Sequence, residues 1–336
     1  MRIVNMNHAH VVIPDLFLPK SEAAQVCADL HLPALEKILA RGKVQPLSAH
    51  SLEAWLCRTF AVPELAIAPV TLTADGVATG DAYWLRADPV HLRLERAQMI
   101  VQTNVSLTMA EAQQLCESLN LYLAGAGMQF FAPHPQRWYL RLDNDPQLST
   151  HSIYQVEGRD SRFYLPQGET ALKWHGLLNE IQMSLHGHPL SQACAARGGL
   201  PVNSLWLWGG GRAVSLAQPF DRMVSDSDLV KAFAQASHIP HSFIADGNVK
   251  QGNVLYVWEE ASVALRRGDF YAWRQSIQSC EQYCILPLLC SLASGTLDKI
   301  TLDVLQEGNS KRFELSRAML WKFWRRPQAL ANYALV

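Results

Sequence analysis

The sequence predicts an α/β protein in which a layered core with a mainly parallel sheet is interrupted by a smaller α+β inserted domain. Strand and helix patterns alternate over the outer parts of the 336 residues, which is typical of parallel sheets covered by helices. The middle section, roughly 78–160, instead places strand patterns on both sides of a single amphipathic helix. We therefore expect residues 1–77 and 161–336 to form the core and residues 78–160 to form the inserted domain.

The first part of the core begins with a strand pattern over 8–18, which contains Ile13-Pro14-Asp15. Helix patterns follow over 21–30, 32–41 and 51–57. Gly42 follows the second of these, and glycine commonly ends helices because it adopts left-handed backbone conformations without steric cost.

The expected inserted domain contains the clearest helix of the chain, over 108–123. Thr108 is a suitable N-cap, and Glu111 follows three residues later, which together form a capping-box pattern. The apolar side chains of this helix share one face: Ala112, Leu115, Cys116, Leu119 and Leu123. Strand patterns flank the helix at 83–87, 91–94, 128–131 and 138–142.

The second part of the core resumes with a helix pattern over 169–185. It continues with the strand 205–208, the helix 227–236, the strand 253–258, the long helix 270–292 and the strand 299–305. The tail 313–324 has an amphipathic pattern.

The segment 201–212 carries the most conspicuous motif. An apolar run, Leu205-Trp-Leu-Trp208, reads as a strand buried on both faces and leads directly into three glycines and Arg212. Glycine lets the backbone approach a ligand closely, and ligands of open α/β sheets bind at strand ends. A tight turn without a ligand accounts for the same residues, so both interpretations stay open.

Composition excludes several classes of protein. The net charge of −1 gives no basic field, which argues against nucleic acid as an obligatory partner, and the longest apolar runs are too short to span a membrane. The N-terminus has no signal-peptide pattern, and the seven scattered cysteines indicate reduced thiols, so we expect a cytoplasmic protein. Cys280, Cys284 and Cys290 are expected to pack in the core rather than bind a metal.

Short segments along nearly the whole chain resemble a known family. The most specific are His188-Pro189, Pro201-Val202-Asn203 and Trp206-Leu207-Trp208-Gly209, and weaker matches lie at 13–15, 32–37, 80–86, 139–141 and 164–168. Together they resemble the archaeal-type cofactor-independent phosphoglycerate mutases of the alkaline phosphatase superfamily. Within that superfamily the nearest resemblance is to the bacterial RpfE-type regulatory proteins. The resemblance implies an alkaline-phosphatase-like core.

The resemblance also implies phosphoryl transfer with two divalent metal ions, held by Asp and His side chains, and a serine that accepts the phosphoryl group. The C-terminal third departs from this pattern, because its last histidine is His241. Glu259 and Glu260 stand where the family has an acidic-His stretch, and Asp303-Val304 replaces its Asp-His pair. Valine cannot bind a metal, so we expect the two-metal site to be lost.

Four acidic residues are remnants of that site: Asp15, Glu259, Glu260 and Asp303. We expect no cofactor, and the alternative is a weakened Mn²⁺ or Mg²⁺ site built from these carboxylates. Ser48 or Ser51 stands at the position of the serine nucleophile. A serine without a base or metal is a poor nucleophile, and an ordinary helix N-cap is the competing interpretation for each.

The candidate ligand-binding residues are mostly cationic. The resemblance places Arg86, Arg96 and Arg141 where the family's substrate-binding arginines lie, and Asn203 and Arg212 of the motif segment complete the set. Arginine presents a planar fork that matches phosphate or carboxylate. Surface ion pairs are the alternative, since Glu95 adjoins Arg96 and Asp143 follows closely after Arg141.

Three hypotheses about function follow. The first is a mutase-like scaffold without the two-metal site, which binds a small phosphorylated ligand or a protein partner in regulation, with no obligatory nucleic acid and no membrane as a partner. The second is an active metal-dependent mutase or phosphohydrolase with divergent ligands. The third is a scaffold whose tail, with Trp321 and Trp324 beside Arg325 and Arg326, docks another protein.

Overall fold

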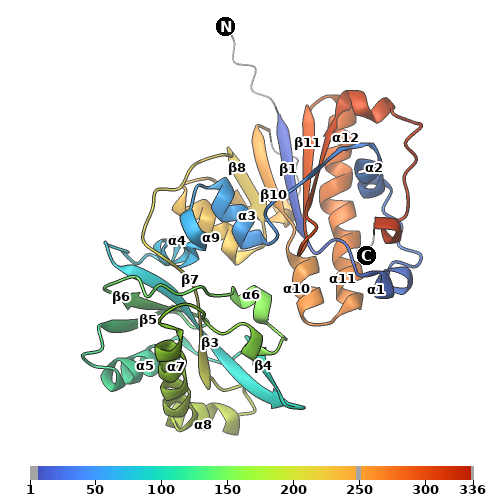
Figure 1. Cartoon of the computed structure of the whole chain (residues 1–336). Coiled ribbons are helices and arrows are strands. Elements are labelled where there is room, and N and C mark those ends of the chain that lie inside the picture. Colours follow the sequence, from blue (N-terminus) through green and yellow to red (C-terminus); the bar gives the residue numbers. More distant parts are fainter. Residues whose placement is uncertain (1–6, 247–250, 334–336) are drawn as a thin grey trace. The chain divides into compact units, whose positions relative to one another are not determined.

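The computed structural model describes residues 7–246 and 251–333. The chain divides into two compact units. A core unit consists of Met1–Ala61 and Leu216–Val336, and an inserted unit consists of Val62–Ser215. Figure 1 shows the elements of both units.

The core unit is built on a seven-stranded sheet in the order β2-β12-β11-β1-β10-β8-β9. The strands are β1 (His8–Pro14), β2 (Lys43–Pro46), β8 (Arg222–Ser225), β9 (His241–Ser242), β10 (Asn253–Val257), β11 (Lys299–Leu305) and β12 (Lys311–Ser316). The central strand β1 runs parallel to both β10 and β11, and β8 is parallel to β10 and β9. Among the described strands, β12 runs antiparallel to both of its neighbours, β11 and β2. The predicted α/β class with a mainly parallel sheet is therefore confirmed.

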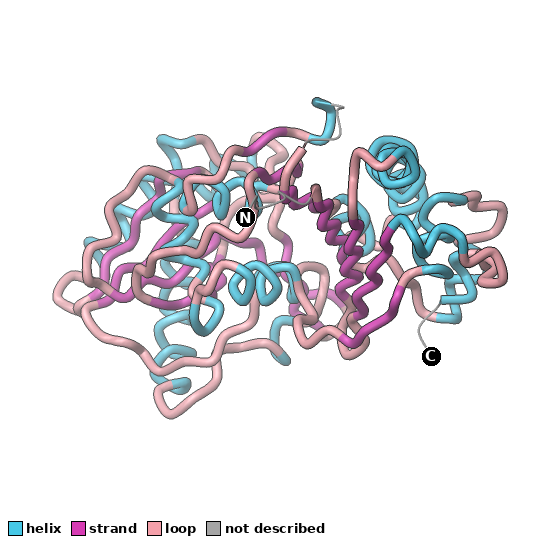
Figure 2. The backbone as a smooth tube through the Cα atoms, turned by 90° about the horizontal axis from the view of Figure 1, so that it is seen from above, coloured by secondary structure: helices cyan, strands magenta, loops and turns pink. Residues whose placement is uncertain are grey.

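Helices cover this sheet because alternate side chains of each strand point to opposite faces. The helices are α1 (Lys20–Val26), α2 (Pro33–Arg41), α3 (Leu52–Thr59), α9 (Asp228–Ala236), α10 (Glu260–Arg266), α11 (Phe270–Cys280) and α12 (Leu286–Ser294). Ala9, Val11 and Ile13 of β1 belong to a large apolar cluster with residues of α2 and α10–α12. His10, on the other face of β1, contacts Trp55 of α3. Figure 2 shows the neighbouring core strands in magenta, with cyan helices on the side of the C-terminus.

The helix expected over 270–292 is present but interrupted. A π-helical turn, Glu281–Ile285, separates α11 from α12. Pro287 lies in the first turn of α12 and cannot donate a backbone hydrogen bond to the preceding turn, which accounts for an irregular helix at this place. Three short 3₁₀ helices, at Ile244–Asp246, Arg317–Trp321 and Leu330–Tyr333, complete the described core.

The inserted unit has a sheet of five antiparallel strands, in which β4, β3, β6 and β5 are neighbours in that order and β7 also pairs with β3. The strands are β3 (Tyr83–Glu95), β4 (Gln98–Gln102), β5 (Met128–His134), β6 (Arg137–Leu142) and β7 (Ser204–Gly211). Its helices are α4 (Ile67–Ala74), α5 (Met109–Tyr122), α6 (Ile153–Val156), α7 (Ala171–His186) and α8 (Pro189–Ala196), with short 3₁₀ helices at Pro63–Leu65 and Ser161–Phe163.

The strand of the glycine-rich motif lies in this inserted unit. The sequence placed it in the parallel core sheet, but β7 pairs antiparallel with β3, with Trp206 opposite Asp88. An apolar run fits any strand with both faces covered, so the run itself does not identify its partner. Leu205 and Leu207 join the apolar cluster of α5 and α7. As a result, the compact unit extends from Val62 to Ser215, beyond the expected 78–160 on both sides.

None of the helices in the described ranges is both long and apolar enough to cross a membrane.

Candidate functional site

Asp303, one of the acidic residues expected at the site, is bonded at both of its carboxylate oxygens. It lies on β11 opposite Val12 of β1, and its side chain is fully buried. Oδ2 accepts hydrogen bonds from Trp55 Nε1 and Arg312 Nη2, both at 2.7 Å, and lies 2.8 Å from His10 Nε2. Oδ1 accepts a hydrogen bond from Arg312 Nε at 2.7 Å.

The parallel and antiparallel neighbours of β11 bring these partners together. His10 comes from β1, and Arg312 is directly opposite Asp303 on β12. Burial alone would raise the pKa of Asp303, but the hydrogen bonds from Arg312 and His10 outweigh it and lower that pKa to about 2. Asp303 is thus a carboxylate whose charge is balanced by a protein cation.

Asp15, Glu259 and Glu260 lie at the ends of β1 and β10, where the C-terminal ends of parallel strands meet. The Asp15 carboxylate accepts a hydrogen bond of 2.5 Å from Ser262 Oγ, and Ser262 in turn accepts one of 2.9 Å from Arg266 Nη1. Arg266 Nη2 also lies 3.5 Å from Glu259 Oε1. Asp15, Ser262 and Glu259 are therefore organised around Arg266.

The two glutamates have raised pKa values. Burial raises the pKa of Glu259, and the charge of Arg266 opposes that rise. Burial and the negative charge of Asp226 both raise the pKa of Glu260. Both shifts oppose the charged carboxylate, which is the form that binds a metal.

The residues present do not fit a pair of divalent metal ions. Over the described ranges, no group of three or more His, Cys, Asp or Glu side chains has an arrangement that could hold a metal. Arg312 bonds Asp303, whereas Arg266 lies beside Glu259 and reaches Asp15 through Ser262. A metal at Asp303 would have to displace a bidentate arginine.

The two serine candidates have different environments. Ser51 is the N-cap of α3, and its side chain accepts a hydrogen bond from Ala54 N at 3.2 Å. Ser48 is exposed on the loop that precedes α3. His50 lies between them in the sequence, but its ring bonds Ser310 rather than either serine.

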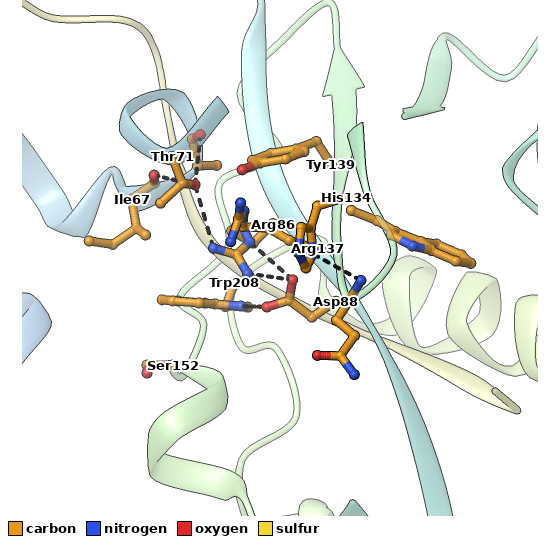
Figure 3. Close-up of polar contacts among 12 residues, drawn as sticks. Ile67, Thr71, Arg86, Asp88, His134, Arg137, Tyr139, Ser152 and Trp208 are labelled. Carbon is orange, nitrogen blue, oxygen red and sulfur yellow. Dashed lines mark hydrogen bonds and ion pairs between the residues drawn. The ribbon is translucent and has the colours of Figure 1, made fainter. Parts of the chain in front are cut away.

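Arg86, in the inserted unit, is a buried structural cation. Its Nε and Nη2 donate to Asp88 Oδ1 at 3.0 and 2.6 Å, and Trp208 Nε1 donates to Asp88 Oδ2 at 2.7 Å. The guanidinium also lies over the rings of Tyr139 and Trp208, at 5.6 and 5.2 Å from their centroids. Figure 3 shows Arg86 enclosed by these side chains and Thr71.

The remaining candidate ligand residues of the inserted unit are dispersed. Asn203 donates to Leu92 O and accepts from Leu92 N, so its amide joins two segments of backbone. Arg96 is exposed in the turn between β3 and β4. Arg141 Nη1 lies 3.7 Å from Asp143, and Arg212 donates to Asp81 O. Arg141 and Arg212 are both exposed, whereas Arg86 and Asn203 have roles within the fold.

Sequence reasoning missed the three residues that complete the Asp303 group. His10, Trp55 and Arg312 are far apart in the sequence, and each is polar only at its tip. A signal was available for Arg312, because an antiparallel hairpin between 299–305 and 311–316 places residues 303 and 312 opposite each other.

The fold and the site define a class of protein. It is an α/β protein with an inserted antiparallel unit, and arginine side chains bond acidic residues of its core sheet. No family model matches the chain. A Geobacter sulfurreducens protein named "Probable 2,3-bisphosphoglycerate-independent phosphoglycerate mutase" is 25% identical over 173 residues, or 48% of this chain and 43% of that protein. The 2,3-bisphosphoglycerate-independent phosphoglycerate mutase of Methanosarcina acetivorans is 26% identical over 153 residues, or 44% of this chain and 37% of that protein.

The matched parts thus span less than half the length of these curated relatives. Among solved structures, the PH0037 protein of Pyrococcus horikoshii superposes with a TM-score of 0.54 and 12% identity, covering 94% of this chain and 88% of that one. The cofactor-independent phosphoglycerate mutase of Thermoplasma acidophilum gives a TM-score of 0.48 and 12% identity, covering 93% of this chain and 90% of that one. The chain is therefore similar in sequence, over about half of its length, to phosphoglycerate mutases, and it shares its α/β fold with the PH0037 protein.

Proposed function

We propose that this chain is a mutase-like scaffold in which arginine side chains have replaced divalent metals, and that it acts as a regulatory protein that binds a ligand or partner. The observation that carries the proposal is the buried Asp303 carboxylate, which accepts both of its Arg312 bonds at 2.7 Å. The regulatory part of the proposal rests on the resemblance of the sequence to RpfE-type regulatory proteins.

An arginine can balance the charge of a carboxylate but cannot supply the chemistry of a metal. Its guanidinium is permanently protonated and has no open coordination position, so it neither activates a nucleophile nor binds a leaving oxygen as a Lewis acid. Ser51, one of the two candidate nucleophiles, is engaged as a helix cap. These features support the absence of mutase turnover.

The exposed arginines of the inserted unit are the proposed ligand contacts. Arg141 is 45% exposed and is held only loosely, 3.7 Å from Asp143, so its guanidinium is available to a phosphate or carboxylate group. Arg86 is excluded from this role, since Asp88 already neutralises it inside the unit. A small phosphorylated molecule or an anionic protein segment fits this chemistry. The seven free cysteines, six of them buried, favour a reducing compartment such as the cytoplasm as the proposed location.

The proposal is tested by measuring Mn²⁺ and Mg²⁺ binding by calorimetry and phosphoglycerate mutase and phosphatase turnover on the purified full chain. We expect no saturable metal binding and no metal-dependent turnover above that of buffer. The matched variant is Arg312→Gln, which removes the cation beside Asp303 and is expected to increase metal affinity if it remains folded by circular dichroism.

Metal-dependent turnover that Asp15→Asn abolishes, with the fold intact, would overturn the proposal. That result would instead support an active mutase or phosphohydrolase with divergent ligands.

A further inference from the structure

The C-terminal part of the core unit displays three large aromatic side chains on its surface. Trp321, Phe323 and Trp324 are 78%, 76% and 66% exposed. They fall within four consecutive residues, at and just after the 3₁₀ helix Arg317–Trp321. We call residues 317–326 the aromatic-basic segment. Figure 1 draws it within the red C-terminal stretch of the core unit.

The backbone of this segment is fixed to the core unit. Arg41 Nη1 donates to Leu320 O, and Arg325 Nη1 donates to Gly42 O at 3.3 Å. Met319 and Leu320 pack against the main apolar cluster, and the buried Leu330 anchors the chain beyond the segment. The aromatic side chains are therefore exposed on an ordered support, which reduces the entropy that binding would cost.

The charges of the segment all have one sign. Arg317, Lys322, Arg325 and Arg326 are its cations, and no aspartate or glutamate follows Glu314 in the sequence. Within the described ranges, none of the four cations forms an ion pair with an acidic side chain. A monomer rarely keeps adjacent exposed aromatic residues unless they bind something.

We propose that the aromatic-basic segment binds reversibly to an anionic lipid surface. Tryptophan and arginine are characteristic of segments that lie at the lipid headgroup level, where rings enter the interface and cations meet acidic lipids. Each Lys or Arg near such a surface strengthens binding by roughly fivefold. The segment has about ten residues, whereas a stable protein interface uses about 20–30 residues on each side, so a lipid surface suits its size better.

This contact lies on a membrane and does not cross it. The expectation of no membrane partner rested on the lengths of the apolar runs. Those lengths argue only against a segment that crosses a bilayer. The aromatic-basic segment shares no residue with the acidic site, so vesicle binding and metal binding are measured independently.

The test is co-flotation of the full chain with vesicles of phosphatidylcholine containing phosphatidylglycerol, with pure phosphatidylcholine vesicles as the comparison. We expect binding to the anionic vesicles, weaker binding at high salt, and at least about tenfold weaker binding to the neutral vesicles. Trp321→Ala/Trp324→Ala is expected to weaken anionic binding at least about tenfold, and Arg326→Glu at least about fivefold.

Phe163→Ala/Tyr271→Ala is the matched control, because both rings are similarly exposed, at 73% and 71%, but lie outside the segment. This variant should bind like the original chain. Equal binding to both kinds of vesicle, no binding to either, or binding unchanged by the tryptophan substitutions would overturn the proposal.

Two other outcomes would assign the segment to a protein. Sedimentation velocity that shows a dimer, converted to a monomer by Trp321→Ala/Trp324→Ala, would identify an interface between copies of this chain. Binding to poly-glutamate that depends on Trp321 and Trp324, without vesicle binding, would identify an acidic protein surface as the occupant.

Discussion

Arg312 binds Asp303 through two hydrogen bonds of 2.7 Å, from Nε and Nη2, across the antiparallel pair β11 and β12. The carboxylate is fully buried, whereas the side chain of Arg312 is 31% exposed. Because the two strands place these residues directly opposite each other, the ion pair also fixes the register at the antiparallel side of a parallel sheet.

Removing this arginine should destabilise the core unit. Arg312→Ala leaves a buried carboxylate with only His10 and Trp55 as partners, and we expect a loss of about 2–4 kcal/mol in the free energy of unfolding. Arg312→Lys keeps the charge but not the two-pronged contact and should lose about half as much. Urea unfolding followed by circular dichroism measures both. Lys311→Ala, one residue earlier on the same strand, is the control and should change stability by less than about 0.5 kcal/mol; an equal loss in both variants would contradict this account.

The stability of the core should decrease as the pH falls below neutrality because of His8. Burial, followed by the charge of His10, lowers the pKa of His8 from 6.5 to about 4, and its ring bonds Thr301 Oγ1 at 2.9 Å. In the unfolded chain this histidine takes up a proton near its ordinary pKa, while in the folded chain it stays neutral down to about pH 4. Its stabilising effect is therefore complete above pH 6.5 and is lost between pH 6.5 and 4. Urea unfolding across this range should show a shallower pH dependence for His8→Asn, and parallel curves for the two proteins would refute the assignment.

Glu281 should stabilise helix α2 from a distant part of the sequence. Ala34 N donates to its Oε1 at 2.7 Å and Leu35 N to its Oε2 at 2.9 Å, while the N-cap residue of α2, Leu32, has no side-chain cap. Glu281→Ala removes both acceptors and should cost about 1–2 kcal/mol. Glu281→Gln, which keeps one oxygen acceptor, should cost about half as much. Hydrogen exchange at the Ala34 and Leu35 amides should become faster in the alanine variant, and unchanged exchange there would count against the cap.

Two glycines of the inserted unit should respond to alanine in opposite ways. A Cβ at Gly211 would lie 2.3 Å from Ala66 Cβ and 3.1 Å from Ala66 Cα, so Gly211→Ala should destabilise the unit by about 1–3 kcal/mol. A Cβ at Gly176, inside α7, would meet nothing within 4 Å, and Gly176→Ala should stabilise the unit by about 0.5–1 kcal/mol because it restricts the unfolded chain. Thermal unfolding of the two variants compares them directly. If both variants shifted the unfolding temperature in the same direction and by a similar amount, the close approach of Gly211 to Ala66 would not explain the effect of a Cβ at Gly211.

Much of the fold could be predicted from local pattern. The capping box at Thr108 and Glu111 is present at the start of α5, with Thr108 N donating to Glu111 at 2.9 Å, because its hydrogen bonds depend only on residues three apart. The partner of β7 could not be predicted, since an apolar strand has the same composition in either sheet. The glycines after Trp208 serve close packing, as the contact of Gly211 with Ala66 shows.

The sequence could predict the acidic residues of the candidate site, but it could not predict the side chains that are bonded to them. Composition and resemblance directed attention to Asp15 and Asp303, and the departure at Val304 indicated that metal ligands were missing. The arginines bonded to these acids, Arg266 and Arg312, become visible only when strand register and helix position are known. Arg86 illustrates the opposite error, because the sequence cannot show that Asp88 turns its side chain inward to neutralise it.

The position of β1 in the middle of the core sheet has a consequence for the growing chain on the ribosome. His8 pairs with Asn253 on one side and Lys299 on the other, so the first strand emerges long before either neighbour exists. The strands of the inserted unit pair within 83–211, so that unit can close while the last third is still being translated. The first strand therefore lacks both of its sheet neighbours throughout this interval, so the apolar side chains and backbone hydrogen-bonding groups of residues 8–14 stay uncovered until residues 253–305 have been made.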